Sequence, residues 1–162
     1  MNARLCILVC AGVLAGSAEY ASAQGFAVRG GANVNPDQMY GGAQYETRIT
    51  DRVWLQPSAD LGVGNGAKLF TVSADIAYRR LLSNRSPWQL VAGGGPAINV
   101  YKLPSYSTTQ AGVGLLAALR HANGLFTEVR LGFYDNADLR LGVGYRFGAR
   151  ATRTPPRSRP RR

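Results

Sequence analysis

Apolar and polar residues alternate along the stretch Ala137–Phe147. The odd-numbered positions from Leu139 to Phe147 are apolar and end in two aromatic residues, whereas the even-numbered positions from Arg140 onward hold only arginine and glycine. A period of two is that of a β-strand, whose successive side chains point to opposite faces, and a helix does not produce it. The stretch therefore predicts a strand with one apolar face and one polar face.

The same alternation recurs from Gln24 onward, and no window there has helical periodicity or an apolar run long enough for a membrane-spanning helix. Turn-forming residues separate the strand-like segments. We expect eight strands, at residues 26–34, 40–49, 53–63, 69–79, 88–101, 108–120, 125–134 and 137–147. Short connections make neighbouring strands antiparallel, and an even number of strands of roughly 9 to 14 residues suits a tilted bilayer crossing. We predict an all-β fold, a closed antiparallel up-and-down eight-stranded transmembrane β-barrel, because closure removes exposed sheet edges.

Glycine and proline mark local features of this sheet. Asn123-Gly124 is a strong hairpin signal between the sixth and seventh strands. Pro57 and Pro96 each lack a ladder donor, so we expect a bulge or weakened pairing at both. The run Gly93-Gly94-Gly95 before Pro96 obscures alternation and register, and we expect a sharp kink there.

The composition of the two faces indicates which one is inside. The polar face mixes isolated charges of both signs with many glycines. A water-facing strand surface has no need of glycine, whereas a narrow lumen must offset its large side chains with small ones. The apolar face carries no charge along the crossing strands, and its aromatic residues lie near strand ends, as in interfacial girdles. We therefore predict an apolar outer face that meets lipid.

Charged residues on the polar face would then form a buried network, because buried charges persist only when they are paired and hydrogen-bonded. The expected members are Glu46, Arg48, Asp60, Asp75, Arg79, Glu128, Arg130 and Arg140. Within this set we expect Asp60 and Asp75 to face Arg130 and Arg140. At eight strands such a lumen is filled rather than conducting.

The two ends of the chain differ from its body. Residues 1–23 combine a positive charge, a short apolar run and the small-residue pattern Ala21-Ser22-Ala23, which predicts a signal peptide cleaved between Ala23 and Gln24. Residues 24–147 form the barrel domain. Residues 148–162 are rich in arginine and proline, and we expect a disordered tail.

Charge and cysteine content narrow the functional classes. The formal net charge is +10, but the tail contributes six arginines and no acid, so the high charge does not indicate a nucleic-acid partner for the body. The tail either contacts anionic lipid or acidic cell-wall polymer, or has no partner. Both cysteines fall in the signal peptide, so the mature chain has no disulfide and no cysteine metal site.

The signal peptide, the run of hairpins and the last strand, with Tyr145 and Phe147 near its end, resemble small outer-membrane β-barrel proteins of the OmpA/OmpX type. The resemblance implies a bacterial outer-membrane location, contact with outer-membrane lipid, and reading of the last strand by the insertion machinery. It also implies that both barrel termini face the periplasm. The chain departs from the family pattern in one respect, since fifteen residues follow Phe147.

Catalysis is not indicated. His121 is the single histidine, and it lies beside the predicted turn at Asn123-Gly124. A catalytic base needs a nucleophile within reach, and a metal site needs several ligands. The sequence offers His121 no second histidine, and no cysteine of the mature chain, as a further ligand. We expect a structural or interaction role without cofactor or metal. Two alternatives stay open: a soluble periplasmic, lipocalin-like barrel that binds an apolar ligand, and an outer-membrane enzyme that modifies lipid A. The resemblance implies that lipid A deacylases of this barrel type have a Ser/His site on the outer-leaflet side. His121 falls at the opposite end of the barrel.

Overall fold

The computed structural model describes residues 24–147 except 35, 36, 65, 84, 104 and 136. The expected signal peptide, with its cleavage position at Ala23, and the expected tail at 148–162 lie outside the described residues. The strands are β1 (Gly25–Val34), β2 (Asp37–Arg48), β3 (Val53–Gly64), β4 (Ala67–Leu81), β5 (Trp88–Lys102), β6 (Ser107–His121), β7 (Leu125–Phe133) and β8 (Ala137–Phe147). The described part of the chain contains no helix that is both long and apolar enough to cross a membrane.

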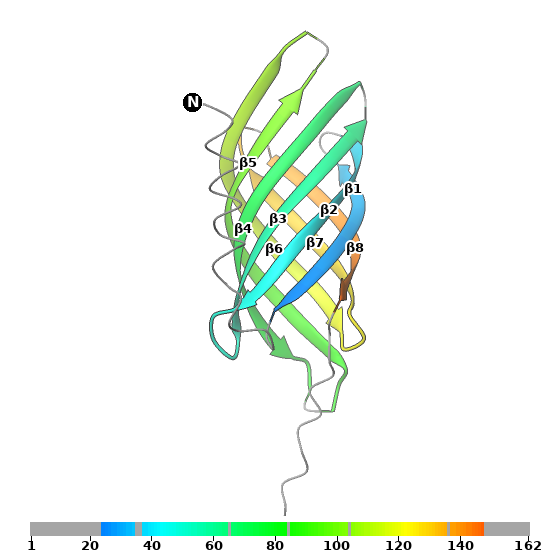
Figure 1. Cartoon of the computed structure of the whole chain (residues 1–162), viewed down its shortest axis with the longest axis vertical. Helices are drawn as coiled ribbons and strands as arrows, with labels where there is room; N and C mark the ends of the chain where they lie inside the picture. Colours follow the sequence, from blue (N-terminus) through cyan, green and yellow to red (C-terminus); the bar gives the residue numbers. More distant parts are fainter. Residues whose placement is uncertain are drawn as a thin grey trace, which may run out of the picture.

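The eight strands form a closed barrel in which each pairs antiparallel with the next, and β8 closes the sheet on β1 (Figure 1). Phe26 of β1 lies opposite Phe147 of β8, so both ends of the barrel chain lie at one end of the cylinder. We call this the terminal end; here β2 is followed by β3, β4 by β5, and β6 by β7. The opposite end, where β1 is followed by β2, β3 by β4, β5 by β6, and β7 by β8, is the loop end. The predicted eight-stranded antiparallel barrel is confirmed.

The turn between β6 and β7 has the chemistry that its sequence indicates. Gly124 has a φ of 104°, a left-handed conformation that glycine adopts without steric cost. Its amide donates to the carbonyl of His121, at 3.0 Å, and the side-chain oxygen of Asn123 accepts from the amide of Leu125, also at 3.0 Å. Gly66, in the turn between β3 and β4, likewise has a positive φ, of 72°.

Pro57 and Pro96 interrupt pairing without shifting the register. The β2–β3 ladder lacks its pairs opposite Gln56 and Pro57, and the β4–β5 ladder lacks those opposite Gly95 and Pro96, but the register is the same on both sides of each gap. Pairing is therefore weakened without a bulge. β5 runs unbroken through its glycines, where the neighbouring backbone comes so close that a Cβ at Gly95 would collide with the carbonyl of Ala74.

The two faces of the sheet lie as predicted. Large apolar side chains point outward along every strand and are about half exposed, for example Leu141 at 47 % and Ile76 at 57 %. Polar and charged side chains at the inward positions are mostly buried; Glu46 and Asp75 are 0 % and 1 % exposed. A small apolar cluster also lies inside, formed by Ala77, Val91, Leu116 and Ala118.

Candidate functional site: the charged lumen

Alternation along the strands directs carboxylates and arginines into the interior of the barrel. Inward positions recur at every second residue, so each strand supplies polar side chains at several depths. Among the described residues, the carboxylates that take part are Glu46, Asp60, Asp75, Glu128 and Asp138, and the arginines are Arg29, Arg79, Arg120, Arg130, Arg140 and Arg146. Together they fill the lumen in three groups.

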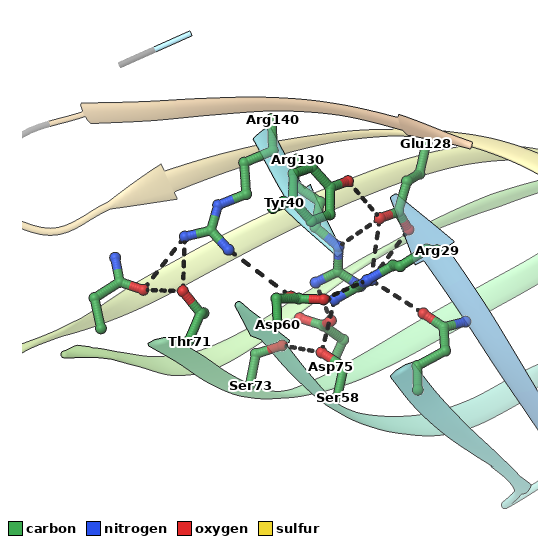
Figure 2. A network of polar contacts seen from close by, with 12 residues as sticks. Arg29, Tyr40, Ser58, Asp60, Thr71, Ser73, Asp75, Glu128, Arg130 and Arg140 are labelled. Carbon is green, nitrogen blue, oxygen red and sulfur yellow. Dashed lines mark hydrogen bonds and ion pairs between the residues drawn. The ribbon is translucent and has the colours of Figure 1, made fainter. Parts of the chain in front are cut away.

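The first group surrounds Arg29, whose side chain is fully buried (Figure 2). Its Nε donates to Asp60 Oδ1 at 2.9 Å and its Nη2 to Asp60 Oδ2 at 2.6 Å. Its Nη1 lies 3.1 Å from Glu128 Oε1 and also donates to the side-chain oxygen of Gln44. Ser58 Oγ accepts from Nη2 at 2.9 Å, so Arg29 joins groups from three other strands.

The second group, which includes Arg130 and Arg140 (Figure 2), lies toward the loop end, where β8 begins. Arg130 donates to Asp75 Oδ2 at 2.6 Å, and Arg140 lies 3.8 Å from Asp60. We expected Asp60 and Asp75 to face Arg130 and Arg140 as a set, without assigned partners, and the two pairs lie within that set. Arg140 also pairs with Asp138 at 2.8 Å and donates to Thr71 Oγ1 at 3.0 Å.

The third group lies at the terminal end and has an excess of positive charge. Glu46 accepts ion pairs from Arg79 at 2.8 Å, from Arg146 at 2.9 Å and from Arg120. The guanidinium of Arg79 lies 3.9 Å from the centre of the Trp54 ring, a cation–π contact. One buried carboxylate thus forms ion pairs with three arginines, so the electrostatic stabilisation of this group depends on a single side chain.

Arg48 does not join these groups, and its predicted place in the lumen network is wrong. Its strand position has inward parity, but β2 ends at Arg48 and the side chain is 46 % exposed. It pairs with Asp51 in the following turn, which is itself 85 % exposed. Parity indicates the face of a residue and not its depth, so a charge at a strand end reaches water instead of the interior.

Sequence reasoning missed several members of the lumen groups. Arg29, Arg120, Arg146 and Asp138 lie on inward positions next to outward apolar residues, and this parity was the available signal. It was weakest for Arg29, because Gly30, Gly31 and Ala32 follow it and give little contrast between faces.

Inward glycines leave room for large side chains. A Cβ at Gly142 would collide with the hydroxyl of Tyr40, and a Cβ at Gly132 would collide with the ring of Tyr134. Tyr134 lies just beyond β7, and burial raises the pKa of its hydroxyl above the ordinary value. A cavity of about 20 Å³ among Asp75, Arg130 and neighbouring residues has room for about one water molecule. Around this cavity the inward side chains therefore fill the lumen.

The proposed assembly-signal residues lie on the outer surface at the terminal end. Tyr145 and Phe147 are 44 % and 49 % exposed, with ring centres 5.2 Å apart. The Phe147 ring also stacks on Phe26 of β1, at 6.3 Å. These three rings form an aromatic patch across the β1–β8 seam; its reading by an assembly machinery stays a prediction.

His121 lies at the terminal end, where β6 gives way to its turn. Its ring packs edge-on against Trp88, with centres 4.7 Å apart, and its Nδ1 accepts from the amide of Asn123 at 3.3 Å. Both contacts are those of a residue that stabilises a turn. Within the described ranges, no group of three or more His, Cys, Asp or Glu side chains is arranged to hold a metal ion.

No family model and no curated protein matches the chain. The N-terminal β-barrel domain of Pseudomonas aeruginosa OprF superposes with a TM-score of 0.64 at 15 % identity, covering 78 % of this chain and 98 % of that one. Neisserial surface protein A follows with 0.59 at 14 % identity, covering 76 % and 94 %. The chain shares the closed eight-stranded barrel fold of these two proteins.

The outer membrane enzyme PagL has the same type of barrel, with a TM-score of 0.51 at 13 % identity and coverage of 76 % of this chain and 98 % of that one. At these identities the outer-membrane-type barrel is shared as a fold only, because one fold carries many functions. What this barrel does must be argued from its own side chains.

Proposed function

We propose that the protein is an integral protein of the bacterial outer membrane, with a structural or interaction role and a lumen filled by its own side chains. The observation that carries this proposal is the inverted distribution of side chains. Half-exposed leucine, valine and isoleucine cover the outside, and ion pairs that are nine-tenths or more buried occupy the inside. An apolar band of this kind is stable in hydrocarbon and unfavourable in water.

Export and assembly complete the proposal. The signal peptide directs the chain across the inner membrane and is removed before Gln24. The terminal end then faces the periplasm, where the insertion machinery reads the strand that ends in Tyr145 and Phe147. The arginine-rich tail stays on the periplasmic side, where anionic lipid or acidic cell-wall polymer is the partner that its charge would favour.

The decisive experiment is fractionation of cells that produce the full chain. We expect recovery in the outer-membrane fraction, release only by detergent, and a folded form that migrates differently on gels when the sample is not boiled. Recovery in a detergent-free periplasmic extract would overturn the proposal and favour a soluble, lipocalin-like barrel. That alternative needs an apolar interior, whereas the described interior is mainly polar.

The packed lumen supports a barrel that does not conduct. Arg29 and its partners span the interior, and a cavity beside them, among Asp60, Asp75 and Arg130, has room for about one water molecule. In planar lipid bilayers we expect no steady single-channel current from the purified protein. A stable open level at moderate voltage would contradict a filled lumen.

A non-catalytic role is also part of the proposal. The contacts of His121 with Trp88 and with the amide of Asn123 support a turn residue rather than a base beside a nucleophile. The test against a lipid A-modifying enzyme is the lipid A profile of cells with and without the gene, for which we expect identical species. A changed acylation pattern would favour the enzyme.

A further inference from the structure

Two lysines lie directly opposite each other on the outer surface of the barrel. Lys68 of β4 and Lys102 of β5 are register partners at the loop end. Both side chains point outward and are exposed. Within the described residues, no ion pair joins either lysine to a carboxylate.

Like charges directly opposite on adjacent strands destabilise a sheet, because their Cβ atoms are only about 5 Å apart. An anion held between the two ammonium groups would convert this repulsion into attraction. The pair thus has the charge and spacing to bind one anionic group, and a group with two negative charges matches it best.

The outer surface next to the lysines, toward the middle of the barrel, is apolar. The next outward register pair toward the middle of the barrel is Phe70 with Val100, and the one after it is Val72 with Ile98. Phe70 and Ile98 are 45 % and 49 % exposed. The lysine pair therefore lies at the loop-end edge of an apolar strip on β4 and β5. This is the level at which headgroups meet acyl chains in a bilayer.

We propose that Lys68 and Lys102 bind the phosphomonoester headgroup of a membrane lipid, whose acyl chains lie along the strip of Phe70, Val72, Ile98 and Val100. A phosphomonoester carries between one and two negative charges near neutral pH, since its second pKa is about 6. A free phosphate ion would use the lysines but not the strip below them. The inference rests on the proposed membrane location, because only there does a lipid meet this surface.

The experiment measures lipid binding to the purified full barrel in nonionic detergent by native mass spectrometry. The probes are phosphatidic acid, which carries a phosphomonoester, and phosphatidylglycerol, which carries a singly charged phosphodiester. We expect phosphatidic acid to bind more tightly. The double variant Lys68→Gln/Lys102→Gln should weaken its binding by about tenfold, and the charge-conserving Lys68→Arg/Lys102→Arg should retain it.

Arg80→Gln is the matched control, because Arg80 is an exposed cation on the same strand β4 at the terminal end. We expect this variant to bind phosphatidic acid like the wild type. Equal loss in Arg80→Gln, or no loss in the double glutamine variant, would overturn the proposal. Displacement of the lipid by inorganic phosphate at equal concentration would reveal a free-phosphate site and would overturn it as well.

Heat-modifiable mobility, measured on every variant, separates this proposal from the one on which it rests. A variant that stays folded and membrane-bound but keeps its lipid affinity contradicts only the lysine site. A wild-type protein that is recovered without detergent contradicts the membrane location itself.

Discussion

Arg29 and Asp60 form a two-point ion pair inside the barrel, with Nε–Oδ1 at 2.9 Å and Nη2–Oδ2 at 2.6 Å. They belong to β1 and β3, which are not neighbours in the sheet. Both side chains are almost completely shielded from solvent, at 0 % and 3 % exposure. The pair therefore holds together strands that share no backbone hydrogen bonds, and it does so where water does not screen the charges.

Removing one member of this pair should be costly. Asp60→Asn leaves the Arg29 guanidinium buried with only Glu128 to neutralise it. We expect a loss of about 3–5 kcal/mol in the free energy of unfolding, the usual cost of breaking a buried pair. Urea titration of the refolded barrel in lipid vesicles, followed by gel mobility, measures this loss.

The matched control is the exposed pair of Arg48 and Asp51. Asp51→Asn should change the unfolding free energy by no more than about 1 kcal/mol, because exposed ion pairs contribute little. A second variant, Arg29→Met/Asp60→Leu, removes both charges and should recover part of the loss of the single variant. Equal effects of Asp60→Asn and Asp51→Asn would mean that the lumen pair is not energetically distinct from a surface pair.

The outer face is tested by Leu141→Arg. Leu141 lies in the middle of β8 and points outward at 47 % exposure. An arginine near the middle of the bilayer costs about 2–4 kcal/mol, so we expect less folded protein in membranes. The matched control is Leu82→Arg, at a position of 57 % exposure in the turn after β4, where the new charge meets water or headgroups. Assembly of Leu141→Arg at the level of Leu82→Arg would count against a lipid-facing surface.

Much of this architecture could be predicted from residue alternation, and the rest depends on geometry that alternation does not contain. The period of two assigns each residue to a face, which is why Asp75 and Arg130 were both expected inside. Which side chains then meet depends on strand tilt and stagger around the whole barrel. Alternation also does not predict how deep in the lumen a side chain lies. Arg48 has inward parity, but it lies at the end of β2 and its side chain reaches solvent. Arg29 was not predicted, because the small residues that follow it give little contrast between the two faces of the strand.

Gly142 gives Tyr40 the space that it needs, which yields a prediction about packing. The Tyr40 hydroxyl lies 3.3 Å from Glu128 Oε1 and occupies the position where a Cβ of residue 142 would point. We expect Gly142→Ala to cost about 1–3 kcal/mol by overpacking. Tyr40→Phe removes the colliding atom, so the double variant should lose less than the sum of the two single losses. A double-mutant cycle from urea titrations measures the difference, and strict additivity would show that the two residues do not compete for space.

Among the carboxylates that the structure describes, Glu46 is the one that pairs with Arg79, Arg120 and Arg146. Glu46→Gln leaves three guanidinium groups close together without a counter-charge, and we expect a loss of about 3–5 kcal/mol in unfolding free energy. Asp138→Asn is the control; it should cost less, since Arg140 keeps Thr71 and Asn99 as hydrogen-bond acceptors. Part of the remaining repulsion should weaken with ionic strength, because Arg146 is 19 % exposed at the terminal end. Raising the salt concentration during the urea titration should therefore stabilise Glu46→Gln more than the wild type, and an equal response of both proteins would contradict an uncompensated arginine cluster.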